Sequence, residues 1–165
     1  MKKVAFLFLI YDALEQEELW RRFFADADPD QYSILIHYKE DRPLRHFEPF
    51  KLSACIDTKY ADVSLVHAHN LLLREAMKDP DNDKFVFVSQ SCVPLKTFPH
   101  VYQFLTQDDS GYFNLFPVSE CFPRCDSIRK RTLWASPATS GYASCMAESS
   151  NGGSFANWDS LAMRA

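Results

Sequence analysis

The stretch KFVFVSQSCVPL, residues 84–95, changes from apolar to small and polar halfway along its length. Its first part, residues 85–89, lacks polar alternation, which is typical of a strand buried on both faces of a parallel sheet. The polar residues Ser89, Gln90 and Ser91 then follow. Ligands of open α/β sheets bind where the strands end at their carboxyl side. The stretch therefore predicts a binding edge after a buried strand; the alternative is an ordinary polar turn.

Strand and helix signals alternate along the part of the chain that precedes this stretch. Continuous apolar runs predict strands over residues 4–10 and 32–37, and a helical pattern lies between them. A second helical pattern separates residues 32–37 from the strand at 85–89. Brief strands are also predicted at 53–57 and 111–116. The alternation predicts an α/β fold with a doubly wound, mostly parallel sheet.

The predicted helices have recognisable first residues and apolar stripes. Asp12 is expected to cap the first helix, with Glu15 completing a capping box. Asp62 is expected to cap the second helix, and a short third helix is predicted over residues 100–105. The apolar stripe of the first helix consists of Leu19, Trp20, Phe23, Phe24 and Ala27.

Length and composition predict one folded domain followed by a different kind of segment. The chain has 165 residues, of which 47% are hydrophobic and 15% aromatic, enough to build a real core. Toward the carboxyl end the sequence becomes rich in Ser, Ala, Gly and Asn without a sustained period. We therefore expect a half-domain over residues 1–131 and an irregular or disordered tail over residues 132–165.

The charge and the apolar runs argue against several functions. A net charge of −4 and a pI of about 5.7 do not provide the basic face that nucleic-acid binding needs. No apolar run approaches the roughly 20 residues of a membrane span, so no membrane segment is expected in this chain. Five cysteines, an odd number, give no disulfide framework. No dinucleotide-binding or P-loop glycine motif is present.

The acidic and cysteine-containing segments do not match metal-binding motifs. Residues 79–83 match the first five positions of a calcium loop, but Lys84 stands where the loop needs Gly and Gln90 where it needs Glu. Cys121 and Cys125 have no second Cys or His pair in a zinc arrangement. We expect no metal cofactor.

The predicted strand ends carry groups that suit a nucleotide. Tyr11 follows the first strand, residues 37–39 (His-Tyr-Lys) follow the second, and residues 89–91 follow the central strand. Aromatic and imidazole rings can pack on a base, a lysine can offset phosphate charge, and hydroxyls can hold a ribose. Cys92 offers a different interpretation, a thiol nucleophile of a hydrolase, but a buried structural cysteine is the more common situation.

Several of these blocks, taken in order, resemble a known enzyme family. The sequence is similar to the Core-2/I-branching β-1,6-N-acetylglucosaminyltransferases, particularly their plant and algal branch, over about residues 3–117. The blocks that carry the resemblance are VAFLFLIY (4–11), LWxxFF (19–24), YSIxIH (32–37), VSLVxA (63–68) and FVxxSxSCVPL (85–95).

The resemblance implies a GT-A-like, Rossmann-like fold and a glycosyltransferase that uses a UDP-sugar. The implied donor is UDP-N-acetylglucosamine, the acceptor is a glycan hydroxyl, and the anomeric carbon is inverted. The family works without the Asp-x-Asp metal motif, and Ser89-Gln90-Ser91 stands at the corresponding strand end. The family also implies a glycoprotein anchored in the Golgi membrane with its domain in the lumen.

The resemblance assigns nucleotide-binding positions but no catalytic residue, because the family's catalytic Glu and its diphosphate-binding basic residues lie beyond the matching region. The chain is thus expected to be mainly the donor-binding half of the enzyme. The alternative is a degenerate, non-catalytic α/β fragment that acts as a binding or interaction module. The positions assigned to the nucleotide are Tyr11, His37, Lys39, Ser64, Ser89, Gln90 and Ser91.

Overall fold

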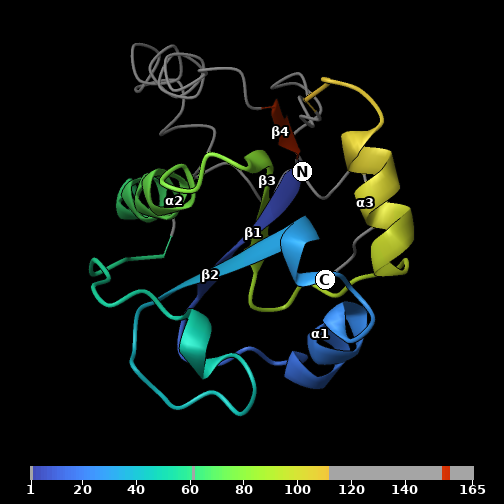
Figure 1. Cartoon of the computed structure of the whole chain (residues 1–165). Helices are drawn as coiled ribbons and strands as arrows, with labels where there is room; N and C mark the ends of the chain where they lie inside the picture. The colour runs from blue at the N-terminus through green and yellow to red at the C-terminus, as the bar shows by residue number, and fades with distance from the viewer. Residues whose placement is uncertain (1, 61, 112–153, 157–165) are drawn as a thin grey trace, which may run out of the picture. The chain divides into compact units, whose positions relative to one another are not determined.

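The computed structural model describes residues 2–60 and 62–111, together with the backbone of residues 154–156. All of them belong to one compact unit. In chain order its elements are β1 (Lys3–Ile10), α1 (Glu17–Phe24), η1 (Pro29–Gln31), β2 (Tyr32–Tyr38), η2 (Glu48–Phe50), α2 (Ser64–Ala76), β3 (Asn82–Ser89), α3 (Phe98–Thr106) and β4 (Ser154–Ala156), as Figure 1 shows.

The strands form one parallel sheet in the order β2-β1-β3-β4. β1 lies between the two strands that the sequence predicts as its neighbours, and residues 4–8 are wholly buried. An unbroken apolar run suits this position because both faces of a central parallel strand are covered. The predicted strands at 4–10, 32–37 and 85–89 are therefore confirmed.

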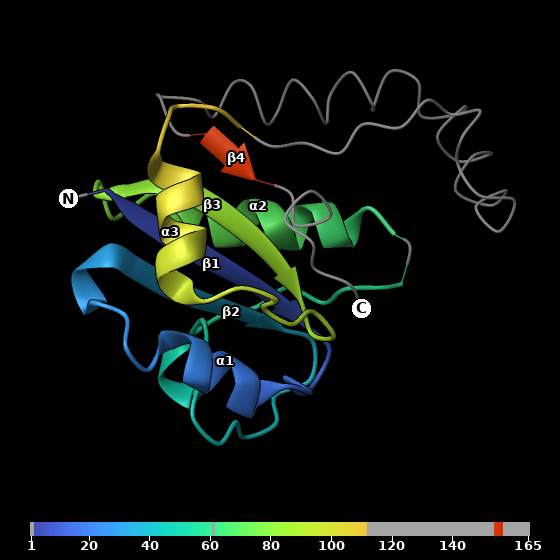
Figure 2. The same cartoon turned by 90° about the vertical axis from the view of Figure 1, so that its right-hand side faces the viewer.

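Helices cover both faces of the sheet. Figure 2 shows α1 and α3 on one side and α2 on the other. The connection from β2 through α2 to β3 is a parallel crossover, which usually contains a helix. This arrangement confirms the predicted α/β class and the doubly wound, GT-A-like architecture.

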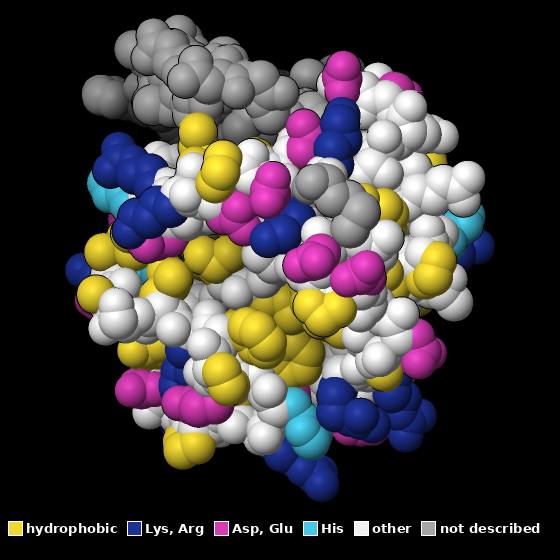
Figure 3. Space-filling view, in the orientation of Figure 1, with side chains coloured by type: hydrophobic (Ala, Val, Ile, Leu, Met, Phe, Trp, Pro, Cys, Tyr) yellow, Lys and Arg dark blue, Asp and Glu magenta, His cyan; other side chains and the backbone are white. Residues whose placement is uncertain are grey.

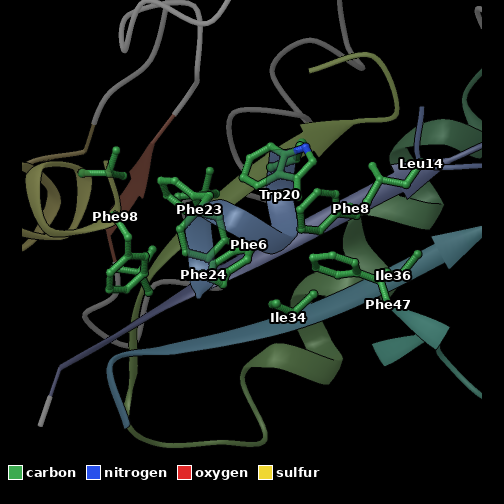
Figure 4. Packing of buried hydrophobic residues seen from close by; sticks show 14 of the residues in the cluster. Phe6, Phe8, Leu14, Trp20, Phe23, Phe24, Ile34, Ile36, Phe47 and Phe98 are labelled. Atoms are coloured by element: carbon green, nitrogen blue, oxygen red, sulfur yellow. The ribbon is translucent and has the colours of Figure 1, made fainter. Parts of the chain in front are cut away.

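An aromatic cluster fills the space between the sheet and α1. Phe6 on β1 makes edge-on contacts with three residues of the predicted helical stripe, Trp20, Phe23 and Phe24, at centroid distances of 6.3, 5.8 and 5.0 Å (Figure 4). Phe98 at the start of α3 packs against Phe23 at 5.5 Å. Aromatic pairs in this geometry add to the stabilisation from buried area.

Two local predictions are wrong. α1 begins at Glu17 without a side-chain cap, and Asp12 instead pairs with Arg42 at 2.9 Å. A long-range cation thus takes the carboxylate that the capping box would use. Residues 53–57 form no strand; the contact beside β2 is a single bridge between Ile36 and Lys51.

The remaining predicted elements differ in how far the structure addresses them. Val63 precedes α2 and provides no capping side chain. Asp62, the predicted cap, lies one residue earlier, and its carboxylate accepts a hydrogen bond from the Ser64 amide at 2.9 Å. The third helix is confirmed and is longer than expected, Phe98–Thr106. The predicted strand at 111–116 and the predicted tail at 132–165 lie outside the described residues, except for β4, a short strand that pairs with β3.

Candidate functional site

The carboxyl ends of β1, β2 and β3 meet at one edge of the sheet. Leu9 near the end of β1 lies opposite His37 of β2 on one side and Ser89 of β3 on the other. All three strands point the same way in Figure 2, so the loops that follow them share this edge. The strand ends therefore meet as the sequence predicts. We call the carboxyl ends of β1, β2 and β3, together with the loops that follow them, the strand-end edge.

Tyr11 and Lys39 form the part of the strand-end edge that follows β1 and β2. The Tyr11 carbonyl accepts hydrogen bonds from the amides of Lys39 at 2.9 Å and Glu40 at 2.8 Å, which joins the two loops. The Lys39 ammonium lies 5.2 Å from the centre of the exposed Tyr11 ring. An exposed ring beside a cation suits both a base and a phosphate.

A carboxylate completes this group. The Tyr11 hydroxyl donates to Glu40 at 2.7 Å, and Arg42 pairs with the same side chain at 3.1 Å. These two hydrogen bonds, that from Tyr11 first, lower the pKa of Glu40, and Glu40 in turn raises the pKa of Tyr11. Both side chains therefore keep their ordinary neutral-pH charge states. The sequence does not mark Glu40 or Arg42, which lie in an otherwise unremarkable charged loop.

Small polar side chains gather after β3. The Ser89 hydroxyl lies 3.4 Å from that of Ser91 and 3.0 Å from the Cys92 sulfur. The Cys92 amide donates to the Ser89 carbonyl at 3.2 Å, which closes a tight turn. Within residues 2–60 and 62–111, no imidazole hydrogen-bonds to this sulfur, so the geometry gives the thiol-nucleophile interpretation no support. Clustered hydroxyls are suited to ribose or phosphate oxygens.

Gln90 connects the loop after β3 to the loop after β1. Its side-chain carbonyl accepts from the Tyr11 amide at 2.7 Å, and its NH₂ group donates to Glu15 at 3.3 Å. The buried Trp20 contacts the loop after β3 as well, because its indole N–H donates a hydrogen bond to the Cys92 carbonyl at 3.0 Å. Gln90 therefore lies where the sequence predicts, but its amide is engaged by protein groups.

His37 lies beneath the strand-end edge instead of on its surface. Its side chain is wholly buried, and Nε2 accepts a hydrogen bond from the Ile56 amide at 3.1 Å. Nε2 is therefore unprotonated, and burial lowers the pKa of the ring. The ring supports the edge from inside, and its contact with a nucleotide stays a prediction.

Ser64 is held by the turn that leads into α2. Its hydroxyl accepts from the Lys59 amide at 2.9 Å, and its own amide donates to Asp62. Figure 2 shows that α2 begins at the end of the sheet where the strand arrows point. None of the hydrogen bonds in the described part of the chain joins Ser64 to Tyr11, Lys39 or Ser89, so its role in binding also stays a prediction.

Three further observations concern metal binding, membrane spans and surface charge. Among residues 2–60 and 62–111, no group of three or more His, Cys, Asp or Glu side chains is arranged to hold a metal ion. None of the helices described is long and apolar enough to cross a membrane. Figure 3 shows acidic and basic side chains interspersed over one face, around exposed hydrophobic groups.

A parallel sheet with helices on both faces and polar loops at its carboxyl edge defines a GT-A-like α/β domain of the Rossmann type. The family model described as "Core-2/I-Branching enzyme" matches residues 4–120, and the chain belongs to this family. The sequence is 29% identical, over 149 residues, to "Glycosyltransferase BC10" of Oryza sativa subsp. japonica. That match covers 81% of this chain and 37% of the rice protein. No solved structure matches the chain.

Proposed function

We propose that this chain is the donor-binding half of a glycosyltransferase that transfers N-acetylglucosamine from UDP-N-acetylglucosamine to a glycan hydroxyl. The observation that carries the proposal is the single row formed by Leu9, His37 and Ser89, which brings three polar loops to one edge. Membership of the Core-2/I-branching family and the printed name of the rice relative support the reaction class. The complete protein would work in the Golgi.

The strand-end edge has groups for the uracil, the ribose and the diphosphate of the donor. The exposed Tyr11 ring would pack on the uracil, the Lys39 ammonium would offset charge on the diphosphate, and the hydroxyls of Ser89 and Ser91 would contact the ribose. Because Ser89-Gln90-Ser91 supplies no carboxylate at the strand end, we propose that the donor binds without a metal. Such an enzyme needs basic side chains to stabilise the leaving diphosphate.

Transfer with inversion needs a general base that takes the proton of the acceptor hydroxyl. We assign this role to no residue of the strand-end edge. Glu40, the carboxylate nearest to Tyr11, already bonds to Tyr11 and Arg42, and these bonds lower its pKa and make it a weaker base. The contribution of this chain is therefore binding and orientation of the donor.

Binding of UDP tests the proposal directly. In saturation-transfer NMR with the full chain, UDP is expected to give a signal that UDP-N-acetylglucosamine abolishes by competition, while ATP at the same concentration gives a much weaker one. Equal signals from UDP and ATP, or none from either, would contradict donor binding and favour the alternative of a non-catalytic interaction module.

Lys39 is expected to strengthen UDP binding through its charge. A hydrogen bond to a charged group contributes about 1.5–3 kcal/mol, so Lys39→Met should weaken UDP binding by about tenfold or more. Uridine, which lacks phosphate, should bind both proteins equally. Lys59→Met is the matched control, since Lys59 is an exposed lysine whose backbone amide, not its ammonium, makes the local hydrogen bond. Titration calorimetry would measure the affinities of the unmodified protein, Lys39→Met and Lys59→Met for UDP and for uridine.

A further inference from the structure

The loop that follows β2, residues 39–51, begins at the strand-end edge and then runs beside α1 (Figure 1). Lys39 is the first residue of this loop. Arg42, three residues later, forms an ion pair at 2.9 Å with Asp12 in the loop after β1. The loop is rich in charged residues and includes Pro43 and Pro49, so it has little regular structure of its own. Its conformation therefore depends on contacts with the rest of the protein.

One side chain of α1 provides such contacts. The Glu17 carboxylate accepts hydrogen bonds from three consecutive backbone amides of the loop, those of Arg45 at 3.1 Å, His46, and Phe47 at 2.9 Å. Successive amides that converge on one point form an anion-binding nest, and here the anion belongs to the protein itself. Hydrogen bonds to an ionised acceptor are about twice as strong as neutral ones.

This contact lies beside a loop residue that belongs to the hydrophobic core. Phe47, whose amide donates a hydrogen bond to Glu17, is buried. Its ring packs on Phe8 of β1 at a centroid distance of 6.3 Å. Glu17 is itself the first residue of α1 and is partly buried. Removing its charge would leave amides in a partly buried place without a strong acceptor, a situation that destabilises the loop conformation.

We propose that Glu17 is a positioning residue of the donor site, an inference that rests on the proposed function. Its carboxylate fixes residues 45–47 on the core, and the fixed loop holds Lys39 over Tyr11 and Arg42 beside Asp12. Glu17 itself does not touch the donor. A donor that binds a protein without this contact must first order the loop, which weakens its affinity.

Glu17→Gln tests the proposal, because glutamine keeps the size of the side chain and removes its charge. In the full chain, we expect UDP to bind at least fivefold more weakly, and the amides of residues 45–47 to exchange with deuterium faster. Glu17→Asp retains the charge and should recover part of the affinity. Glu75→Gln is the matched control, since Glu75 is a helical carboxylate paired with Lys78 at the far end of α2.

The outcomes separate this inference from the function on which it rests. Faster exchange at residues 45–47 with an unchanged affinity for UDP would show that Glu17 only stabilises the loop, which would overturn the positioning role while the proposed function stands. Failure of the unmodified protein to bind UDP would overturn both. Weaker UDP binding with native-like thermal unfolding and faster exchange, absent in Glu75→Gln, would establish the role.

Discussion

Replacing Trp20 with alanine is expected to lower the free energy of unfolding by about 3–5 kcal/mol. Trp20 is wholly buried and meets Phe8 edge-on at 4.9 Å and Phe23 at 5.4 Å. Truncation would leave a cavity among rings that can collapse only partly. Small domains have total stabilities of about 5–15 kcal/mol, so the variant should be close to unfolding. Urea denaturation followed by circular dichroism would measure the change.

Trp20→Phe separates packing from the hydrogen bond to the loop after β3. Phenylalanine keeps most of the buried ring but cannot donate to the Cys92 carbonyl, which Trp20 reaches at 3.0 Å. We expect a smaller loss of stability than in Trp20→Ala, together with faster amide exchange in residues 90–93. A Trp20→Ala variant that loses less than about 1 kcal/mol would show that the aromatic cluster is not the main source of stability.

The sequence predicts the sheet well because its information is local. The apolar run over residues 4–10 specifies a strand buried on both faces, and the stripe from Leu19 to Phe24 specifies the helix face that covers it. Since parallel strands end on one side, the meeting of Tyr11 and Ser89 at one edge also follows from the order of strands and helices. These features depend on the period and polarity of neighbouring residues, which the sequence displays.

The contacts that shape the strand-end edge are different, because they join residues far apart in the chain. No residue near Glu17 indicates that its carboxylate accepts hydrogen bonds from amides 28–30 positions later. In the same way, no residue near Gln90 indicates that its side chain accepts a hydrogen bond from the Tyr11 amide. Asp12 follows the capping pattern, yet Arg42 takes its carboxylate. Such side chains have several possible partners of similar energy, and only the folded chain decides among them.

His37 shows a third case, in which the position is predicted but the direction of the side chain is not. Successive side chains of a strand point to opposite faces, so a residue at a strand end can lie under the neighbouring helix. The ring of His37 is wholly buried, and in its protonated form it would lower the pKa of His69 of α2. A polar residue near the end of an apolar strand is therefore not sufficient evidence of exposure at the edge.

The buried His37 and the partly buried His69 predict that the protein loses stability in mild acid. Burial, and then the charge of His37, lowers the pKa of His69 to about 4, and burial also lowers the pKa of His37. Both groups have higher pKa values, about 6.5, in the unfolded chain. Between these values the unfolded chain binds more protons, so stability is fully present above about pH 6.5 and falls as the pH is lowered toward 4.

The expected loss from His69 alone is about 2 kcal/mol between about pH 7.5 and 5, from the linkage of protonation to unfolding. His69→Leu should remove this part of the pH dependence, because leucine cannot be protonated beside Phe87, which the imidazole contacts edge-on at 4.9 Å. His67→Leu, at an exposed position of the same helix, is the matched control and should retain the full dependence. Urea denaturation at several pH values would measure the three slopes. If the slopes of His69→Leu and the unmodified protein coincide, His69 is protonated at a similar pH in the folded and unfolded states, and its burial does not determine the acid sensitivity.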